Sequence, residues 1–170
     1  MGDDVTVRTA LAADLPLLHP VIERAYRGDS ARQGWTHEAD LLSGERIDYD
    51  TLKAHVDDPQ QLLLIAERDG AIVGCVSLTR QDGAQAYLGL LCVDPACQAG
   101  GIGKAIIAAA ERVARADMGA ERIEMTVISS RKELIAYYER RGFRRTGEMR
   151  SFPILVDPPL EMVVLEKALV

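Results

Sequence analysis

A glycine-rich turn is the segment whose residue types and spacing point most directly to chemistry. It reads Gln98-Ala99-Gly100-Gly101-Ile102-Gly103-Lys104, between an apolar run that ends at Val93 and a segment with helical periodicity. Backbone N–H groups in such a turn, together with the positive end of the following helix dipole, bind phosphate groups. Glycine lets the backbone come close to the anion. The turn therefore predicts a phosphate-binding site.

Two common phosphate motifs do not match this turn. A Walker A loop needs glycine where Gln98 stands and Ser or Thr after Lys104, where the chain has Ala105. A dinucleotide fingerprint needs a third glycine at Ile106 within a parallel β-α-β unit. The turn instead fits the pattern [QR]-x-x-G-x-[GA] at Gln98, Gly101 and Gly103.

This pattern resembles the acyl-CoA pyrophosphate loop of the GNAT family of N-acetyltransferases. Val93-Asp94-Pro95 precedes the loop as it does in that family, and the run from Ile135 to Phe143 (IAYYERRGF) resembles its C-terminal helix signature. The resemblance covers about residues 5–168. It implies an acetyl-CoA-dependent enzyme that moves an acetyl group directly to a primary amine of a small molecule or peptide. It implies no metal.

The resemblance also implies how the co-substrate is bound. Residues 98–104, from Gln98 through Ala99, Gly100, Gly101, Ile102 and Gly103 to Lys104, are expected to hold the pyrophosphate. The main chain of Leu91, Cys92 and Val93 is expected to pair with the pantetheine arm. Arg131 stands where many relatives carry Asn, so it is interpreted either as a contact to a CoA phosphate or as a solvated residue at a helix start.

Tyr138 matches the tyrosine that acts as general acid in many members of the family. A proton donor near the sulfur assists the departing CoA thiolate, and a phenol with a pKa of about 10 suits that leaving group. Tyr137 is a competing candidate. The structural alternative for Tyr138 is an amphipathic core residue with a solvated tip.

The resemblance implies that residues 28–47 line the acceptor site. Many relatives carry a Glu on the strand before the turn, but here that strand has no carboxylate, so the base is Glu38, with Asp40 as a second candidate, or a chain of water molecules. Glu124 is a weaker candidate that is expected to face solvent. Trp35 together with Glu38 and Asp40 is predicted to bind a cationic amine through its ring and the carboxylates. Trp35 has an alternative role as a plug for one end of the core, and residues 150–153 are expected to cover the acceptor from the other side.

The elements that must position these residues follow from hydrophobic periodicity. Strands are predicted at 5–8, 62–67, 72–78, 86–93, 122–128, 143–148 and 161–169, and helices at 14–27, 49–57, 104–117 and 131–141. Asp14 is expected to cap the first helix. The order predicts a mixed α/β sheet packed by helices. The resemblance implies that this α/β fold is a mostly antiparallel twisted sheet with helices on both faces, in one N-acetyltransferase domain over residues 1–170.

Composition limits the class of partner. The chain has 170 residues and a net charge of −6, which disfavours nucleic acid. Residues 29–58 hold eight acidic and three basic residues, which either attract a cationic partner or form a solvated acidic surface, the interpretation that charge alone favours. No apolar run is long enough to span a membrane, and the protein is expected to be cytoplasmic.

The last expectations concern the cysteines, the oligomeric state and an alternative function. The three cysteines, Cys75, Cys92 and Cys97, are expected to be buried and reduced, because no C-x-x-C pair is present. A homodimer is common in the family. The alternative function is a non-catalytic acyl-CoA-binding sensor or scaffold.

Overall fold

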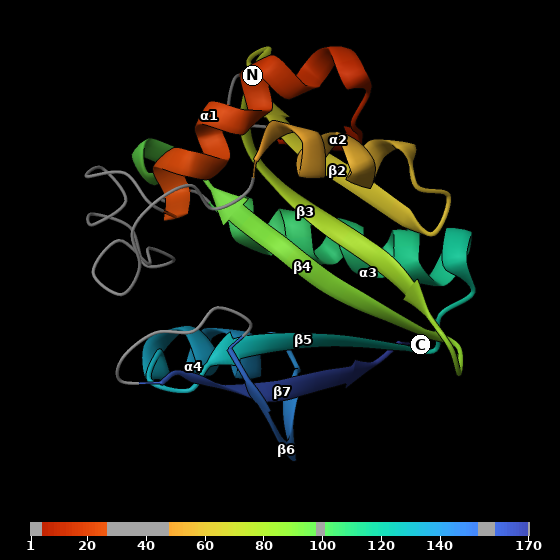
Figure 1. Ribbon diagram of the computed structural model, residues 1–170, viewed down its shortest axis with the longest axis vertical. Helices are drawn as coiled ribbons and strands as arrows, with labels where there is room; N and C mark the ends of the chain where they lie inside the picture. The colour runs from red at the N-terminus through yellow and green to blue at the C-terminus, as the bar shows by residue number, and fades with distance from the viewer. Residues whose placement is uncertain (1–4, 27–47, 98–100, 153–158, 170) are drawn as a thin grey trace.

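The computed structural model describes residues 5–26, 48–97, 101–152 and 159–169 (Figure 1). Seven strands form one sheet in the order β1-β2-β3-β4-β5-β7-β6, in which only the neighbours β4 and β5 are parallel. The strands are β1 (Thr6–Thr9), β2 (Gln61–Arg68), β3 (Ala71–Gln81), β4 (Gln85–Val93), β5 (Arg122–Ile128), β6 (Arg144–Ser151) and β7 (Glu161–Ala168). The helices are α1 (Leu15–Tyr26), α2 (Tyr49–Asp57), α3 (Ile102–Met118) and α4 (Lys132–Arg140).

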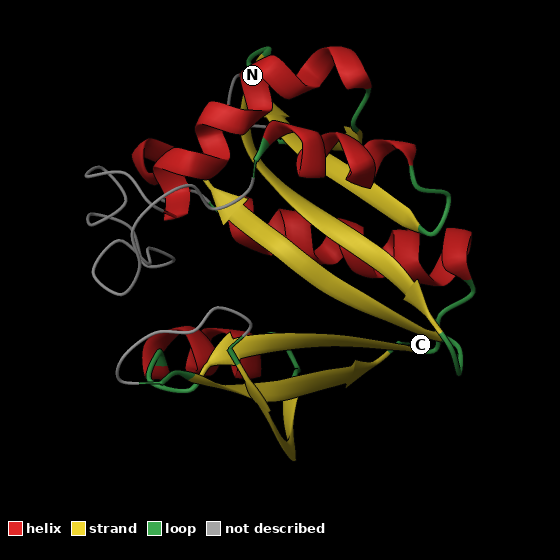
Figure 2. Ribbon diagram, in the orientation of Figure 1, coloured by secondary structure: helices red, strands yellow, loops and turns green. Residues whose placement is uncertain are grey.

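Helices cover both faces of the sheet, as predicted (Figure 2). On one face, α1 packs against β3 and β4 and α2 packs against β2. On the other face, α3 lies across β3 and β4, and the core on this side also includes residues of α4. Leu18 and Ile22 on α1 and Ile106 and Ala110 on α3 are fully buried. Their spacing of four residues gives each helix one apolar face, which explains the two-sided packing.

The last strand lies inside the sheet, a position that the sequence left undetermined. β7 pairs antiparallel with both β5 and β6, so it separates these two strands. Its residues Val163, Val164 and Leu165 are buried on both faces. A strand that is buried on both faces reads as an unbroken apolar run, which is how the segment reads in the sequence.

Asp14 does not cap α1, so that expectation was wrong. It ends a short 3-10 helix, Ala12–Asp14, that precedes α1. Its carboxylate accepts a hydrogen bond from the Leu11 N–H at 2.7 Å and two from the Arg8 guanidinium at 2.8 and 2.9 Å. These bonds tie β1 to the start of α1, and they hold the pKa of Asp14 below its ordinary value, the Arg8 side chain being the largest cause.

The Asp14→Asn variant should lose about 1 kcal/mol of unfolding free energy at neutral pH, because it weakens hydrogen bonds to a charged group. A carboxyl whose pKa is lowered in the folded state stabilises above its unfolded pKa, about 3.9, and that contribution disappears as pH falls through the folded pKa. The difference between wild type and variant should therefore shrink below about pH 4. Urea titrations at a series of pH values measure it, and a difference that grows on acidification would contradict the assignment.

No helix in the described ranges is long and apolar enough to cross a membrane.

Candidate active site

Strands β4 and β5 run together at one end and separate toward the other (Figure 1). They are paired only between Gln85–Tyr87 and Arg122–Glu124, and the last register pair is Tyr87 with Glu124. β4 then continues to Val93 and β5 to Ile128 without further pairing between them. The sheet is therefore opened at its centre, beside the segment that carries Leu91, Cys92 and Val93.

A bulge lies in β4 within this opened region. Cys75 of β3 pairs with Cys92, whereas Ser77 pairs with Gly89, so β4 holds one residue more than β3 over this stretch. Leu90 has a φ of 51°, which is uncommon for a residue other than glycine. Leu88 packs in the core beneath α3, but Leu90, two residues later, packs beneath α1. Because of the extra residue, the alternation of side chains between the two faces of β4 is shifted by one residue after the bulge.

The glycine turn leads into the N-terminus of α3. Gly101 precedes the helix with a φ of 76°, in the left-handed region that favours glycine. The first helical hydrogen bond runs from the Ala105 N–H to the Gly101 carbonyl at 3.0 Å. The N–H groups of Ile102, Gly103 and Lys104 are therefore left over from the helical pattern, at the positive end of the helix dipole. Residues 98–100 lie outside the described part of the chain.

Tyr138 lies on the buried face of α4 and is only 5% exposed. Its ring meets the rings of Phe143 and Tyr137 edge-on, with centroid distances of 6.1 and 5.5 Å. Burial raises the pKa of its phenol, Tyr137 raises it further, and the charge of Arg131 opposes the shift. In the described ranges no hydrogen bond is present at its hydroxyl. Tyr138 is therefore a protonated phenol with hydrogen-bonding capacity to spare.

Tyr137 has different surroundings. It is only half-buried, and the Arg141 guanidinium lies 5.0 Å from its ring centroid. Burial raises the pKa of Tyr137, while Arg141 lowers it. Arg131 directly precedes α4, and its N–H donates to the Ile128 carbonyl at 2.9 Å. Arg131 is the N-cap residue of α4, and its positive charge lowers the pKa of Tyr138.

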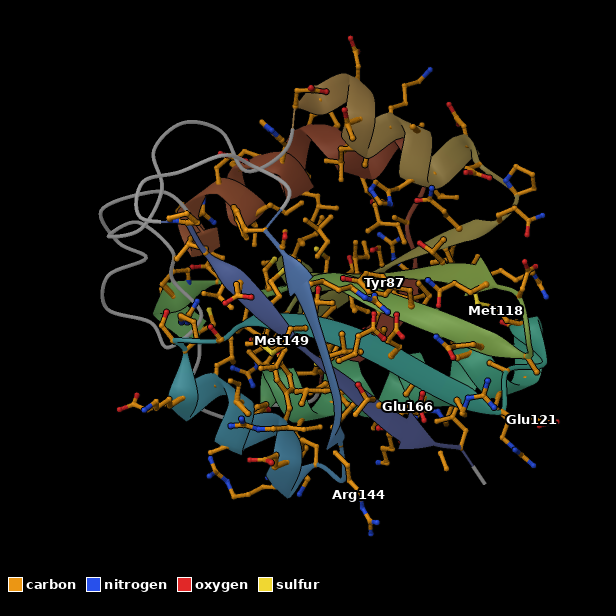
Figure 3. All side chains as sticks on the ribbon, turned by 60° about the horizontal axis from the view of Figure 1, so that its bottom comes forward. Tyr87, Met118, Glu121, Arg144, Met149 and Glu166 are labelled. Carbon is orange, nitrogen blue, oxygen red and sulfur yellow. The ribbon has the colours of Figure 1, made fainter. Side chains whose placement is uncertain are left out.

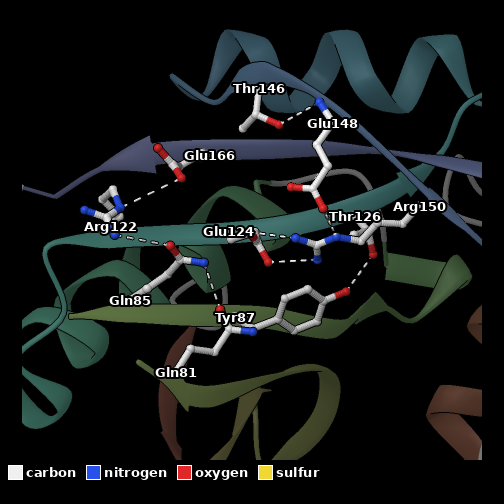
Figure 4. Close-up of polar contacts among 10 residues, drawn as sticks. All are labelled: Gln81, Gln85, Tyr87, Arg122, Glu124, Thr126, Thr146, Glu148, Arg150 and Glu166. Carbon is white, nitrogen blue, oxygen red and sulfur yellow. Dashed lines mark hydrogen bonds and ion pairs between the residues drawn. The ribbon is translucent and has the colours of Figure 1, made fainter. Parts of the chain in front are cut away.

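Glu124 is buried, so the expectation that it faces solvent was wrong. It is only 6% exposed, and both of its carboxylate oxygens accept hydrogen bonds from the Arg150 guanidinium, at 3.0 and 3.2 Å (Figure 4). Arg150 also donates through Nε to Glu148 at 2.7 Å. The three side chains carry a net charge of −1 and join β5 to β6 across β7.

Tyr87 and Thr126 form a second polar contact at the same place. The two hydroxyl oxygens are 2.6 Å apart, which links β4 to β5 just beyond their last register pair. A Cβ atom at Gly89 would lie 3.2 Å from the Tyr87 ring, so glycine leaves room for the ring to lie along β4. In Figure 3, β6 passes in front of β5 and β7, and Tyr87 lies beside it toward β4. Along β5, Glu124 and Thr126 alternate with Ile123, Met125 and Val127, so they occupy the face opposite α3 and α4.

Leu91 and Val93, the first residue of α3 and Tyr138 belong to one apolar cluster, and Arg131 directly precedes the helix that carries Tyr138. Trp35, Glu38 and Asp40 lie outside the described residues, so their predicted roles stay predictions. The sequence analysis missed Tyr87 and Thr126, and it expected Arg150 to cover the acceptor, whereas Arg150 lies in β6 and binds Glu124. Strand alternation over 122–128 could have placed Thr126 beside Glu124, but no local pattern indicates Arg150 as the partner of Glu124.

The sequence pattern of the Acetyltransferase (GNAT) family matches residues 23–143. The chain belongs to this family, whose members use acetyl-CoA, and it is an N-acetyltransferase. No curated protein sequence matches the chain significantly.

Solved structures share the fold. The ribosomal-protein-S18-alanine N-acetyltransferase of Escherichia coli is 17% identical, with a TM-score of 0.75, and the match covers 98% of this chain and 94% of that one. The acetyltransferase yncA of Salmonella typhimurium, solved with its cofactor acetyl-CoA, is 20% identical with a TM-score of 0.72 and the same two coverages. The spermidine/spermine N-acetyltransferase SpeG of Vibrio cholerae is 15% identical, with a TM-score of 0.71 and again 98% and 94% coverage.

Proposed function

We propose that this enzyme transfers the acetyl group of acetyl-CoA directly to a primary amine, with Tyr138 as general acid. The observation that carries the proposal is the opened β4–β5 pair, together with the buried phenol of Tyr138 in the apolar cluster that also holds Leu91 and Val93 of β4. Acetyl-CoA supplies an activated acetyl thioester. The protein must then anchor the CoA molecule, supply a proton to the CoA thiolate and bind the amine.

The chain's own residues fit a CoA molecule at this place. The N–H groups of Ile102, Gly103 and Lys104 are suited to hold the pyrophosphate, and Gln98, Ala99 and Gly100 are proposed to complete that loop. The main chain of Leu91, Cys92 and Val93 is proposed to pair with the pantetheine amides. Because Cys92 and Val93 are buried, the side chains there serve packing while the backbone binds.

Tyr138 is proposed to give its proton to the sulfur as the thioester bond breaks. The raised pKa of the phenol keeps it protonated at neutral pH, as a general acid must be. Arg131, whose charge favours the phenolate, would stabilise Tyr138 after it has lost the proton. Arg131 is therefore proposed to have two roles: it contacts a CoA phosphate, and it stabilises the Tyr138 phenolate.

The amine acceptor is proposed to approach from the face opposite α3 and α4. Tyr87, Thr126 and Glu124 lie on that face where β4 and β5 begin to separate, and Arg150 binds Glu124 there. The charge of −1 on the Glu124–Arg150–Glu148 group favours a cationic amine, in agreement with the acidic segment 29–58. Trp35, Glu38 and Asp40 are proposed to complete the acceptor site, with Glu38 as the base that removes the ammonium proton.

The test combines binding and turnover on the full chain. Calorimetry should show that acetyl-CoA binds, and thiol release from acetyl-CoA should accelerate with at least one amine. By their names, structural neighbours act on an alanine of a ribosomal protein and on spermidine, so the panel should contain peptides with free N-termini, polyamines and amino acids. Turnover with a neutral or anionic amine only would contradict the acceptor class. Binding without turnover across the panel would favour the sensor, and absence of binding would overturn the cofactor site.

A further inference from the structure

Two cysteines of the central sheet face each other across neighbouring strands. Cys75 on β3 and Cys92 on β4 are direct partners in the antiparallel register, and their Sγ atoms are 3.5 Å apart. Opposed residues of antiparallel strands have Cα atoms about 4.5–5.5 Å apart, which is within the range that a disulfide spans. Both side chains are completely buried in the apolar cluster beneath α1 and α2.

The third cysteine is placed differently. Cys97 is partly exposed, so the expectation that all three thiols are buried was wrong for it. It packs against the apolar cluster on the α3 side of the sheet, whereas Cys75 and Cys92 belong to the cluster on the α1 side. Of the three possible cysteine pairs, the fold brings only Cys75 and Cys92 together.

We propose that Cys75 and Cys92 are a modification site that forms a reversible disulfide when the protein meets a peroxide. One thiol sulfur attacks the O–O bond, which gives a sulfenic acid and one water molecule. The sulfur of the second thiol then displaces the sulfenic oxygen as a second water, and the S–S bond closes. The peroxide takes up the two electrons, and the two thiol hydrogens leave in the two water molecules.

Access to the pair depends on local opening, because buried thiols are otherwise inert. The bulge is adjacent: Leu90 has a positive φ, and the Cys75 thiol donates to the Leu90 carbonyl at 3.4 Å. Beyond Tyr87, β4 is no longer paired with β5. Local opening costs more free energy for buried core strands than for exposed loops and ends, and both thiols are completely buried. The disulfide should therefore form slowly, and acid quenching should capture its progress.

The bond would alter the strand that is proposed to hold the pantetheine, a consequence that rests on the proposed function. A disulfide sulfur has no hydrogen, so the bond from Cys75 to the Leu90 carbonyl is lost. Cys92 would also be tied to Cys75 between Leu91 and Val93. We expect the oxidised protein to bind acetyl-CoA several-fold more weakly than the reduced protein.

The test is peptide mapping of the wild-type protein after hydrogen peroxide, with alkylation under denaturing, non-reducing conditions. Trypsin releases Cys75 in residues 69–80, but Cys92 and Cys97 together in residues 81–104. The matched variant Cys97→Ser removes that ambiguity. Linked peptides lighter by two hydrogen atoms in the wild type and in Cys97→Ser, absent in Cys92→Ser and reversed by dithiothreitol, are the expected result.

Other outcomes overturn the proposal. These are alkylation of Cys75 and Cys92 after oxidant, linkage through Cys97, or oxidation that ends as sulfinic acid. Cys97→Ser keeps both cysteines of the proposed pair and removes the third one, so its map stays decisive even if the Cys92→Ser protein misfolds. Calorimetry with acetyl-CoA on the reduced and oxidised forms is the second readout. Equal affinity would overturn the coupling to the cofactor, whereas no binding by either form would count against the proposed function and leave the mass result intact.

Discussion

Replacing Tyr138 by Phe should lower kcat by about 100-fold or more, because a positioned general acid contributes roughly 10²–10⁴-fold to a rate. The substitution removes one hydroxyl and keeps the ring that packs against Phe143. In the described ranges that hydroxyl makes no hydrogen bond, so stability should change little. Thiol release with an amine found active in the panel measures kcat, and calorimetry should show an unchanged Kd for acetyl-CoA.

Tyr137→Phe is the matched control, because it removes the neighbouring hydroxyl from the same helix. Its kcat should stay within about threefold of wild type, since a residue that does not transfer the proton contributes no general-acid catalysis. If Tyr137→Phe loses turnover and Tyr138→Phe does not, the acid has been assigned to the wrong tyrosine. If neither variant loses turnover, proton donation to the thiolate comes from elsewhere.

Replacing Arg150 by Ala should lower the free energy of unfolding by about 2–3 kcal/mol, because a buried charged group that loses its partner carries its full desolvation cost. The group concerned is Glu124, which is 6% exposed and accepts both of its described hydrogen bonds from Arg150. Chemical denaturation of wild type and variant at neutral pH measures the difference. The acceptor KM should rise as well, because the pair lies on the proposed acceptor face.

Arg145→Ala serves as the control from the same strand. Arg145 lies 3.9 Å from Glu139, and both side chains are about half exposed, so the cost should be under about 0.5 kcal/mol. The double variant Glu124→Leu with Arg150→Met replaces both charges by apolar side chains and should recover most of the lost stability. Equal losses for Arg145→Ala and Arg150→Ala would show that Glu124 does not depend on its partner.

The sequence by itself determined the order of the elements and the family. In the described ranges, apolar periodicity located the α-helices and strands to within a few residues, because each of these helices presents one buried face and the sheet is built from long apolar runs. The glycine turn and the Tyr138–Phe143 signature are local in the chain. The left-handed backbone at Gly101 and the buried face of α4 each depend on residues that are neighbours in the chain. The sequence alone could therefore predict these two parts of the candidate site.

Only the tertiary structure decided which distant residues meet. Arg150 reaches Glu124 because β7 inserts between β5 and β6, and nothing local at position 124 shows this. The bulge near Leu90 was hidden because every residue from Leu90 to Val93 is apolar, so a shift in alternation leaves no trace in residue type. The same shift sets the register that places Cys75 against Cys92. Strand pairing joins residues far apart in the chain, and its register depends on the packing of both faces of the sheet at once.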